Sequence, residues 1–129
     1  GTLVGNGVTI VMNTGTVNLN AQSEAILSAP TSGNYQGLLI YAPPTNSINI
    51  QATKNNEVRL EGQEDAFFQG TILAQNLPCW FAGSSQIQKA TVQFVCYTWG
   101  MNGGADAQIM YDPSVFYNPI IAPAILLIQ

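Results

Sequence analysis

The chain has 129 residues, of which 47% are apolar and only 8% are charged, and its formal net charge is −4. Three basic residues cannot neutralise a phosphate backbone or an anionic membrane surface, so the composition argues against nucleic-acid binding and against such a membrane. The sequence contains no histidine, which excludes a Ser-His-Asp or Cys-His catalytic site and leaves its two cysteines without a zinc motif.

The first recognisable element is a glycine followed by a short apolar run, GVTIVM at residues 7–12. Similar runs begin at Gly37 (GLLIYA) and at Gly70 (GTILAQ). The three glycines, at positions 7, 37 and 70, therefore lie 30 and 33 residues apart. Repetition with such a period is typical of stacked structural units.

Each glycine-led run is followed by two more short segments with alternating apolar positions. They lie at residues 16–21 and 24–28, at 47–52 and 57–61, and, more weakly, at 79–83 and 91–95. Alternation places every second side chain on one face, and turn residues between the segments redirect the chain. Because each such unit needs neighbours above and below to bury its apolar face, we predict an all-β fold, a right-handed parallel β-helix of about three to four coils.

We interpret residues 1–129 as a single β-solenoid domain. Its repeats are expected at about 7–29, 37–61 and 70–95. Beyond them, residues 97–104 are interpreted as a glycine-rich loop and 107–111 as one further strand. Residues 96–129 are expected to form a capping region whose apolar tail covers the open end or lies along one side, because open ends expose strand edges.

Two features at the ends of the chain suggest its wider context. The sequence starts without Met or a basic leader, so we expect a fragment of a longer exported protein. Residues 120–128 are apolar but short, and Pro119 and Pro123 interrupt this region, so we do not expect this fragment to span a membrane.

Carboxylate pairs are the remaining candidates for catalysis. They are Glu57 with Glu61, Glu64 with Asp65, and Asp106 with Asp112. Glu57, Arg59 and Glu61 alternate with apolar neighbours, which predicts a solvated outer strand face rather than a site. No pair comes with a basic cluster that would complete a site. We therefore expect no catalytic, cofactor-binding or metal-binding residues, and a chain that is not an enzyme.

Cys79 and Cys96 lie 17 residues apart. In a stacked coil this separation can bring two passes of the chain together, and a disulfide would fit an exported protein. Two buried free thiols are the alternative.

Aromatic residues are candidates for a contact surface. A platform for a sugar or a protein partner would use Trp80, Phe81, Tyr97 and Trp99. The competing interpretation is packing, since large aromatic side chains mostly fill cores. Segments 63–68 and 97–104 read as exposed loops. From these loops we expect contacts through Phe67, Phe68, Tyr97 and Trp99.

Residues 27–41, LSAPTSGNYQGLLIY, resemble a stretch of the TadG-like (TadE/G-related) pilus-assembly proteins of bacteria. The sequences VRLEG at 58–62 and GTILA at 70–74, and the strand QIQKATVQF at 86–94, are similar to further segments of that family. The likeness covers roughly residues 7–112.

The sequence departs from the family pattern in three places. Residues 63–69 are an insertion, Trp80 and Phe81 stand where small polar residues are usual, and an apolar tail follows Asp112.

The resemblance implies an exported C-terminal region of a protein of the Tad (Flp) pilus system or a related envelope apparatus, anchored by a membrane helix in its full-length form. We expect a non-enzymatic structural or adhesive module, extracytoplasmic and either secreted or on the bacterial cell surface. Its partners would be other envelope or pilus proteins or a surface glycan. Two alternatives stay open: a carbohydrate-binding or carbohydrate-active β-helix, and a fragment of a phage or viral spike.

Overall fold

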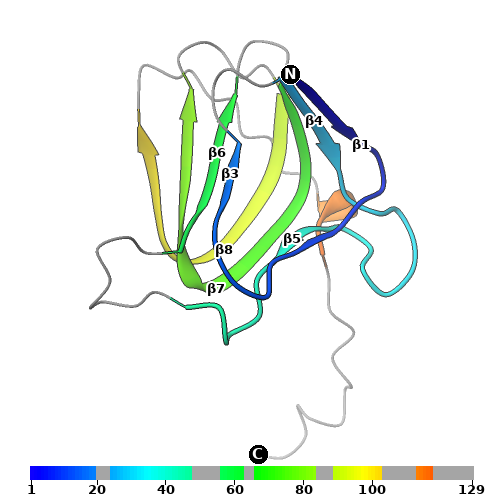
Figure 1. Cartoon of the computed structure of the whole chain (residues 1–129). Helices are drawn as coiled ribbons and strands as arrows, with labels where there is room; N and C mark the ends of the chain where they lie inside the picture. The colour runs from blue at the N-terminus through cyan, green and yellow to red at the C-terminus, as the bar shows by residue number, and fades with distance from the viewer. Residues whose placement is uncertain (20–23, 48–55, 63–65, 84–88, 103–112, 118–129) are drawn as a thin grey trace, which may run out of the picture.

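The computed structural model is an all-β chain with one short 3-10 helix, η1 (Pro113–Val115), in its described part (Figure 1). It describes residues 1–19, 24–47, 56–62, 66–83, 89–102 and 113–117. The strands are β1 (Thr2–Gly5), β2 (Ile10–Val11), β3 (Val17–Leu19), β4 (Glu24–Ser28), β5 (Leu38–Tyr41), β6 (Val58–Gly62), β7 (Phe67–Gly83) and β8 (Lys89–Asn102). All eight belong to one sheet, which curls into a half-barrel (Figure 1).

Every strand pair recorded in this sheet is parallel, and the pairs build three stacks. The first stack runs β1, β4 and then the start of β7 and of β8. The second runs β2, β5 and then the middle of β7 and of β8. The third runs β3, β6 and then the end of β7 and of β8. The two long strands therefore follow the curl through all three stacks (Figure 1).

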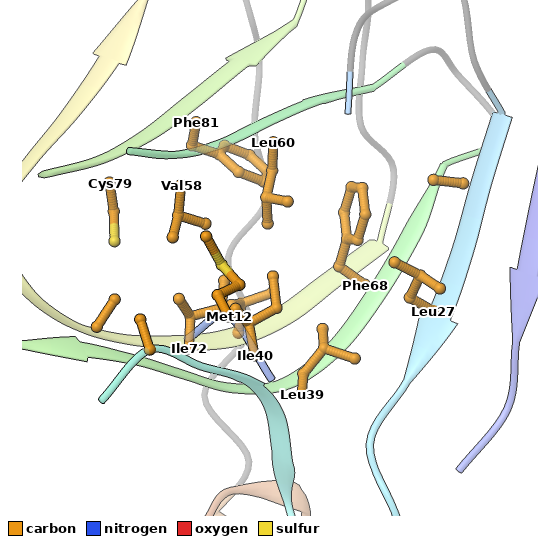
Figure 2. Packing of buried hydrophobic residues seen from close by; sticks show 14 of the residues in the cluster. Met12, Leu27, Leu39, Ile40, Val58, Leu60, Phe68, Ile72, Cys79 and Phe81 are labelled. Atoms are coloured by element: carbon orange, nitrogen blue, oxygen red, sulfur yellow. The ribbon is translucent and has the colours of Figure 1, made fainter. Parts of the chain in front are cut away.

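The concave side of the curl holds the core, because alternate residues of each strand point inward. In β7 the inward side chains include Phe68, Ile72 and Phe81, all fully buried. Val58 and Leu60 of β6 point at the same interior (Figure 2). In β5 both Leu39 and Ile40 belong to the core, because a register irregularity between Leu38 and Ile40 inserts one residue there. The result is a continuous apolar interior that touches all three stacks.

The glycine-led runs stack on one another as the repeat predicted. Ile10 pairs with Ile40, and Ile40 pairs with Ile72. These pairs define the second stack and give it an inward column of isoleucines that ends at Phe94 on β8.

The predicted alignment of the other runs is wrong. Val17–Leu19 pairs with residues 58–60, so the described part of segment 16–21 stacks on segment 57–61, which the repeat had aligned with 24–28. Residues 48–52 of the segment expected beside it lie outside the described residues. Ile26 of β4 pairs with Phe67 rather than with segment 57–61. Several segments share the same apolar alternation, so the alternation alone does not determine which segments pair. The long connection between β5 and β6 determines which segment follows β5 into the third stack.

The segment before residue 118 lies along the outer side of the sheet. The Tyr117 backbone N–H donates to Thr71 Oγ1 at 2.8 Å, and Phe116 is buried. Phe116 and Leu38 are both buried, but neither belongs to the core cluster. The backbone of Phe116 lies against Gly37, since a Cβ at Gly37 would overlap the Phe116 carbonyl. Residues 118–129 and the expected strand at 107–111 lie outside the described residues. No helix in the described part of the chain is long and apolar enough to cross a lipid bilayer.

Candidate contact surfaces

The outer side of β6 carries a row of three charged residues. Arg59 Nε donates to Glu57 Oε1 at 3.1 Å, and Arg59 Nη1 donates to Glu61 Oε1 at 3.2 Å. These hydrogen bonds, the one to Glu57 first, raise the pKa of the Arg59 guanidinium above its usual value. The two carboxylates thus point outward, as predicted, and share one cation.

Trp80 of β7 lies on the same outer face, next to Arg59 in the register. The guanidinium carbon of Arg59 is 5.8 Å from the centre of the indole ring, within range of a cation–π interaction. On the other side, a Cβ at Gly100 of β8 would lie 2.6 Å from Trp80 Cζ3. The indole therefore packs between Arg59 and Gly100, and the glycine provides the space for it.

The remaining acidic pairs cannot be placed. Glu64, Asp65, Asp106 and Asp112 lie outside the described residues. Among the residues that are described, no group of three or more acidic, cysteine or histidine side chains is arranged to hold a metal ion.

The four aromatic residues considered as candidates for a platform do not share one surface. Trp80 is on the outer side, whereas Phe81 is fully buried in the core. Phe81 packs edge-on against Phe94, with ring centres 6.0 Å apart, and Phe94 lies 6.0 Å from Trp99. Adjacent strand residues point to opposite faces, so Trp80 and Phe81 cannot form one platform.

Trp99 is an inward residue at the end of the stack. It pairs with Cys79, whose side chain points into the core, yet Trp99 remains 50% exposed. Tyr97 is 61% exposed at the corner where the β7–β8 register is irregular, between Ala74 and Pro78. Both residues belong to β8, so the interpretation of residues 97–104 as a loop is wrong for 97–102.

The predicted contact residues Phe67 and Phe68 belong to β7 and not to a loop. Phe68 is fully buried and cannot make an outside contact, which corrects that expectation. Phe67 points outward and stacks beside Ile26 of β4. The polar residues just before them suggested a loop, but the strand begins at Phe67, and consecutive side chains in a strand point to opposite faces.

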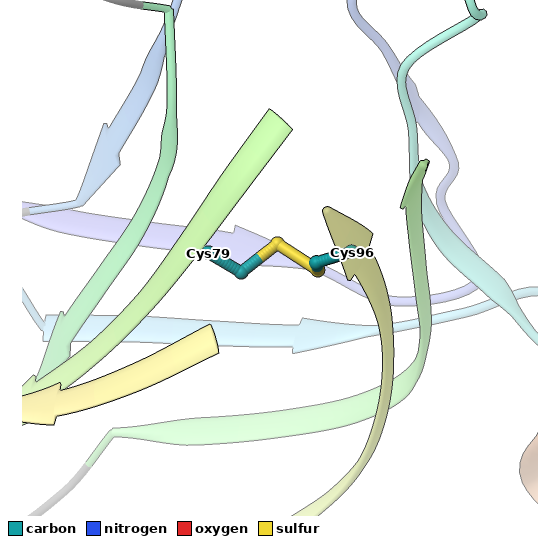
Figure 3. The surroundings of a disulfide bond; sticks show 2 residues. All are labelled: Cys79 and Cys96. Carbon is teal, nitrogen blue, oxygen red and sulfur yellow. A yellow bond between two sulfur atoms is a disulfide. The ribbon is translucent and has the colours of Figure 1, made fainter. Parts of the chain in front are cut away.

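A disulfide joins Cys79 of β7 to Cys96 of β8 (Figure 3). Cys79 is buried and Cys96 packs against the core, so the bond lies inside the curl. It links the third stack to the second across the corner that β7 and β8 share.

An outward apolar row crosses the second stack and was not predicted. Val11 pairs with Tyr41, Tyr41 with Leu73, and Leu73 with Val95. We call these four residues the outer apolar row. Val11 is 51% exposed and Val95 is 38% exposed, so both ends of the row reach solvent. Three of the four residues could have been found from the repeat, since Val11, Tyr41 and Leu73 each directly follow an inward residue of a glycine-led run.

A small pocket lies where η1 meets the sheet. It is lined by Ala29, Pro30, Thr31, Gln36, Gln69, Ser114 and Val115. Its volume is about 60 Å³. The exposed apolar side chains of the sheet are the candidates for contacts that the described residues support.

Comparisons of the chain with protein-family models, with curated proteins and with solved structures find no match. The resemblance to TadG-like proteins thus stays a prediction from the sequence motifs at residues 27–41, 58–62, 70–74 and 86–94.

Proposed function

We propose that this chain is a non-enzymatic structural module of a bacterial cell surface, wound as a right-handed parallel β-helix of about four coils. In this winding, β1 to β3 form the first coil, β4 to β6 the second, β7 the third and β8 the fourth. The parallel register of the three stacks supports it, because each stack is visited once per coil in the same order.

The observation that carries the proposal is the unbroken apolar interior along the stacking direction. The column Ile10, Ile40, Ile72 and Phe94 crosses all four coils, and backbone hydrogen bonds run beside it. Each coil therefore gains its stability from its neighbours, as in other solenoids. Such a body is stiff along its axis and presents its side chains in fixed rows, which suits a scaffold or an adhesive spacer.

Location and partners follow from two further features. The disulfide between Cys79 and Cys96 is typical of an oxidising compartment. The TadG-like motifs favour a pilus or envelope assembly, with the full-length protein anchored in the membrane. The outer apolar row and Tyr97 offer surface for envelope or pilus proteins or for a surface glycan.

Trapping the thiols in the producing cells tests the location. Cells are quenched in acid and alkylated before and after reduction, and intact cells are treated with an added protease. We expect Cys79 and Cys96 to be blocked until reduction and the chain to be cleaved on intact cells. Reduced thiols together with full protection from protease would overturn the proposal.

A panel of polysaccharides tests the non-enzymatic role. We expect no products from any of them. Product release that disappears in Glu57→Ala with Glu61→Ala would make the chain a carbohydrate-active enzyme. Binding without turnover that is lost in Trp80→Ala, but kept in Tyr97→Ala, would indicate a carbohydrate-binding module.

A further inference from the structure

We propose that copies of this chain add to one another end to end, with β8 of one copy pairing in parallel with β1, β2 and β3 of the next. The inference rests on the winding proposed above. It concerns the two ends of the stacks, not the outer faces.

Both ends of the sheet carry strand edges without a partner among the described residues. β8 pairs only with β7, while β1, β2 and β3 pair only with β4, β5 and β6 respectively. Unpaired N–H and C=O groups in a row are a template for another strand. Because every pair in the sheet is parallel, a second copy displaced along the stacking direction would again present parallel strands to the free edge.

The interior columns match across such a joint. Phe94 at the β8 end would lie over Ile10 of the next copy, and Trp99 would lie over Val17. In both columns a large aromatic side chain meets a smaller branched one, the combination that lets layers interdigitate. Trp99 is 50% exposed, and Leu3, an inward position of β1, is 44% exposed. The joint would remove both from water.

The end strands carry almost none of the side chains that protect an edge, although β1, β2 and β3 are short. Charged residues and prolines on edge strands discourage pairing with another chain. The sequences of β1, β2 and β3 contain neither, and β8 contains one charge, Lys89, at its first residue. The side chains of these edges therefore do not oppose pairing at the strand residues themselves.

The symmetry of this contact decides whether the copies form open chains or closed oligomers. Two different surfaces meet, so the contact is heterologous, and copies displaced along the stacking direction do not close into a ring. It leads to open chains of increasing length. A lateral association of solenoids, as in a viral spike, would instead stop at a fixed number of copies.

Two variants block one end each. Trp99→Lys puts a charge at the β8 end, and Leu3→Lys puts one at the β1 end. Tyr35→Lys is the control, because Tyr35 is 55% exposed and lies outside β8 and outside β1 to β3. All proteins are compared by sedimentation velocity over a range of concentrations, after circular dichroism has verified the fold.

We expect the average mass of the unmodified chain and of Tyr35→Lys to rise steadily with concentration. Trp99→Lys alone and Leu3→Lys alone should remain monomeric. Their mixture should give a one-to-one dimer and nothing larger, since each retains one functional end. This dimer also establishes that both variants are folded. Should Trp99→Lys unfold, the milder Trp99→Gln replaces it.

A chain that stays monomeric at every concentration would overturn the inference. So would a single closed trimer, or a mixture of the two blocked variants that fails to form the dimer. A monomeric chain with oxidised cysteines on intact cells would still leave the proposed structural role standing, so the two proposals fail separately.

Discussion

Cys79 and Cys96 meet inside the curl although they belong to different stacks. Cys79 pairs with Val58 in the third stack, whereas Cys96 pairs with Ala74 in the second. Their Cα atoms are 6.0 Å apart. The bond spans the corner at which β7 carries extra residues between Ala74 and Pro78, so it ties the last two long strands together where their register is irregular.

Replacing both cysteines by alanine should lower the free energy of unfolding by about 3 kcal/mol, because the bond closes a 17-residue separation in the unfolded chain. Urea unfolding with and without a reductant measures this. The reductant should destabilise the unmodified protein and leave the double variant unchanged. An unmodified protein that does not respond to the reductant would contradict the expectation.

Asn46 is a buried polar residue that holds two passes of the chain together. Its Nδ2 donates to Met12 O at 3.0 Å and to Gly15 O at 3.3 Å, and its Oδ1 accepts from Asn56 Nδ2 at 3.0 Å. Asn46→Ala leaves these partners unpaired and should cost about 2 kcal/mol in chemical unfolding.

Asn18→Ala is the control for this change, because Asn18 is exposed on β3. It should alter stability by less than about 0.5 kcal/mol. Equal losses of stability in Asn46→Ala and Asn18→Ala would show that the hydrogen bonds of the buried amide do not stabilise the fold.

Gly37 and Gly33 separate backbone strain from packing. Both have positive φ, 78° and 87°, so alanine is strained at either position. A Cβ at Gly37 would overlap the backbone carbonyl of Phe116, whereas nothing lies within 4 Å of a Cβ at Gly33. Gly37→Ala should therefore destabilise more than Gly33→Ala and should release residues 114–117 from the sheet.

Hydrogen exchange at the Tyr117 amide reports this release, since that N–H donates to Thr71 in the folded protein. Exchange should become faster in Gly37→Ala and stay unchanged in Gly33→Ala. The same rate in both variants would mean that the segment docks independently of the glycine.

Arg59→Gln should change stability little, by about 0.5 kcal/mol, because its ion pairs are partly exposed, with 29% of the Arg59 side chain accessible. The effect should shrink at high salt. The folded-state pKa of Arg59 is raised. The contribution of Arg59 to the free energy of unfolding is therefore present below the unfolded-state pKa. It is lost only as the pH rises through the folded-state pKa.

The difference in the free energy of unfolding between Arg59→Gln and the unmodified protein should consequently stay constant from neutral pH to about pH 10, since the pKa of an arginine lies well above this range. Unfolding curves across this pH range test it. A difference that disappears below pH 10 would mean that Arg59 is not the group responsible.

The sequence by itself determined the local pattern of this protein. The alternation in Val58, Arg59 and Leu60 put the charged residue outside and its neighbours inside, because that alternation is a property of any strand. The glycine-led runs likewise indicated which residues stack in the second column, since Ile10 and Ile40 occupy equal places in two similar runs.

Only the tertiary structure decided which of several similar strands lie side by side. Val17 pairs with Val58, because the connection between β5 and β6 is long enough to delay the next strand of that stack. The stacking of the strands also decided that Trp99 of β8 points inward at the end of the third stack and that Asn46 is buried. A two-residue alternation shows which side of a strand is apolar. It contains no information about which strand lies next to it in the sheet. That partner strand is selected by the lengths of the loops and by the interior that the strands share.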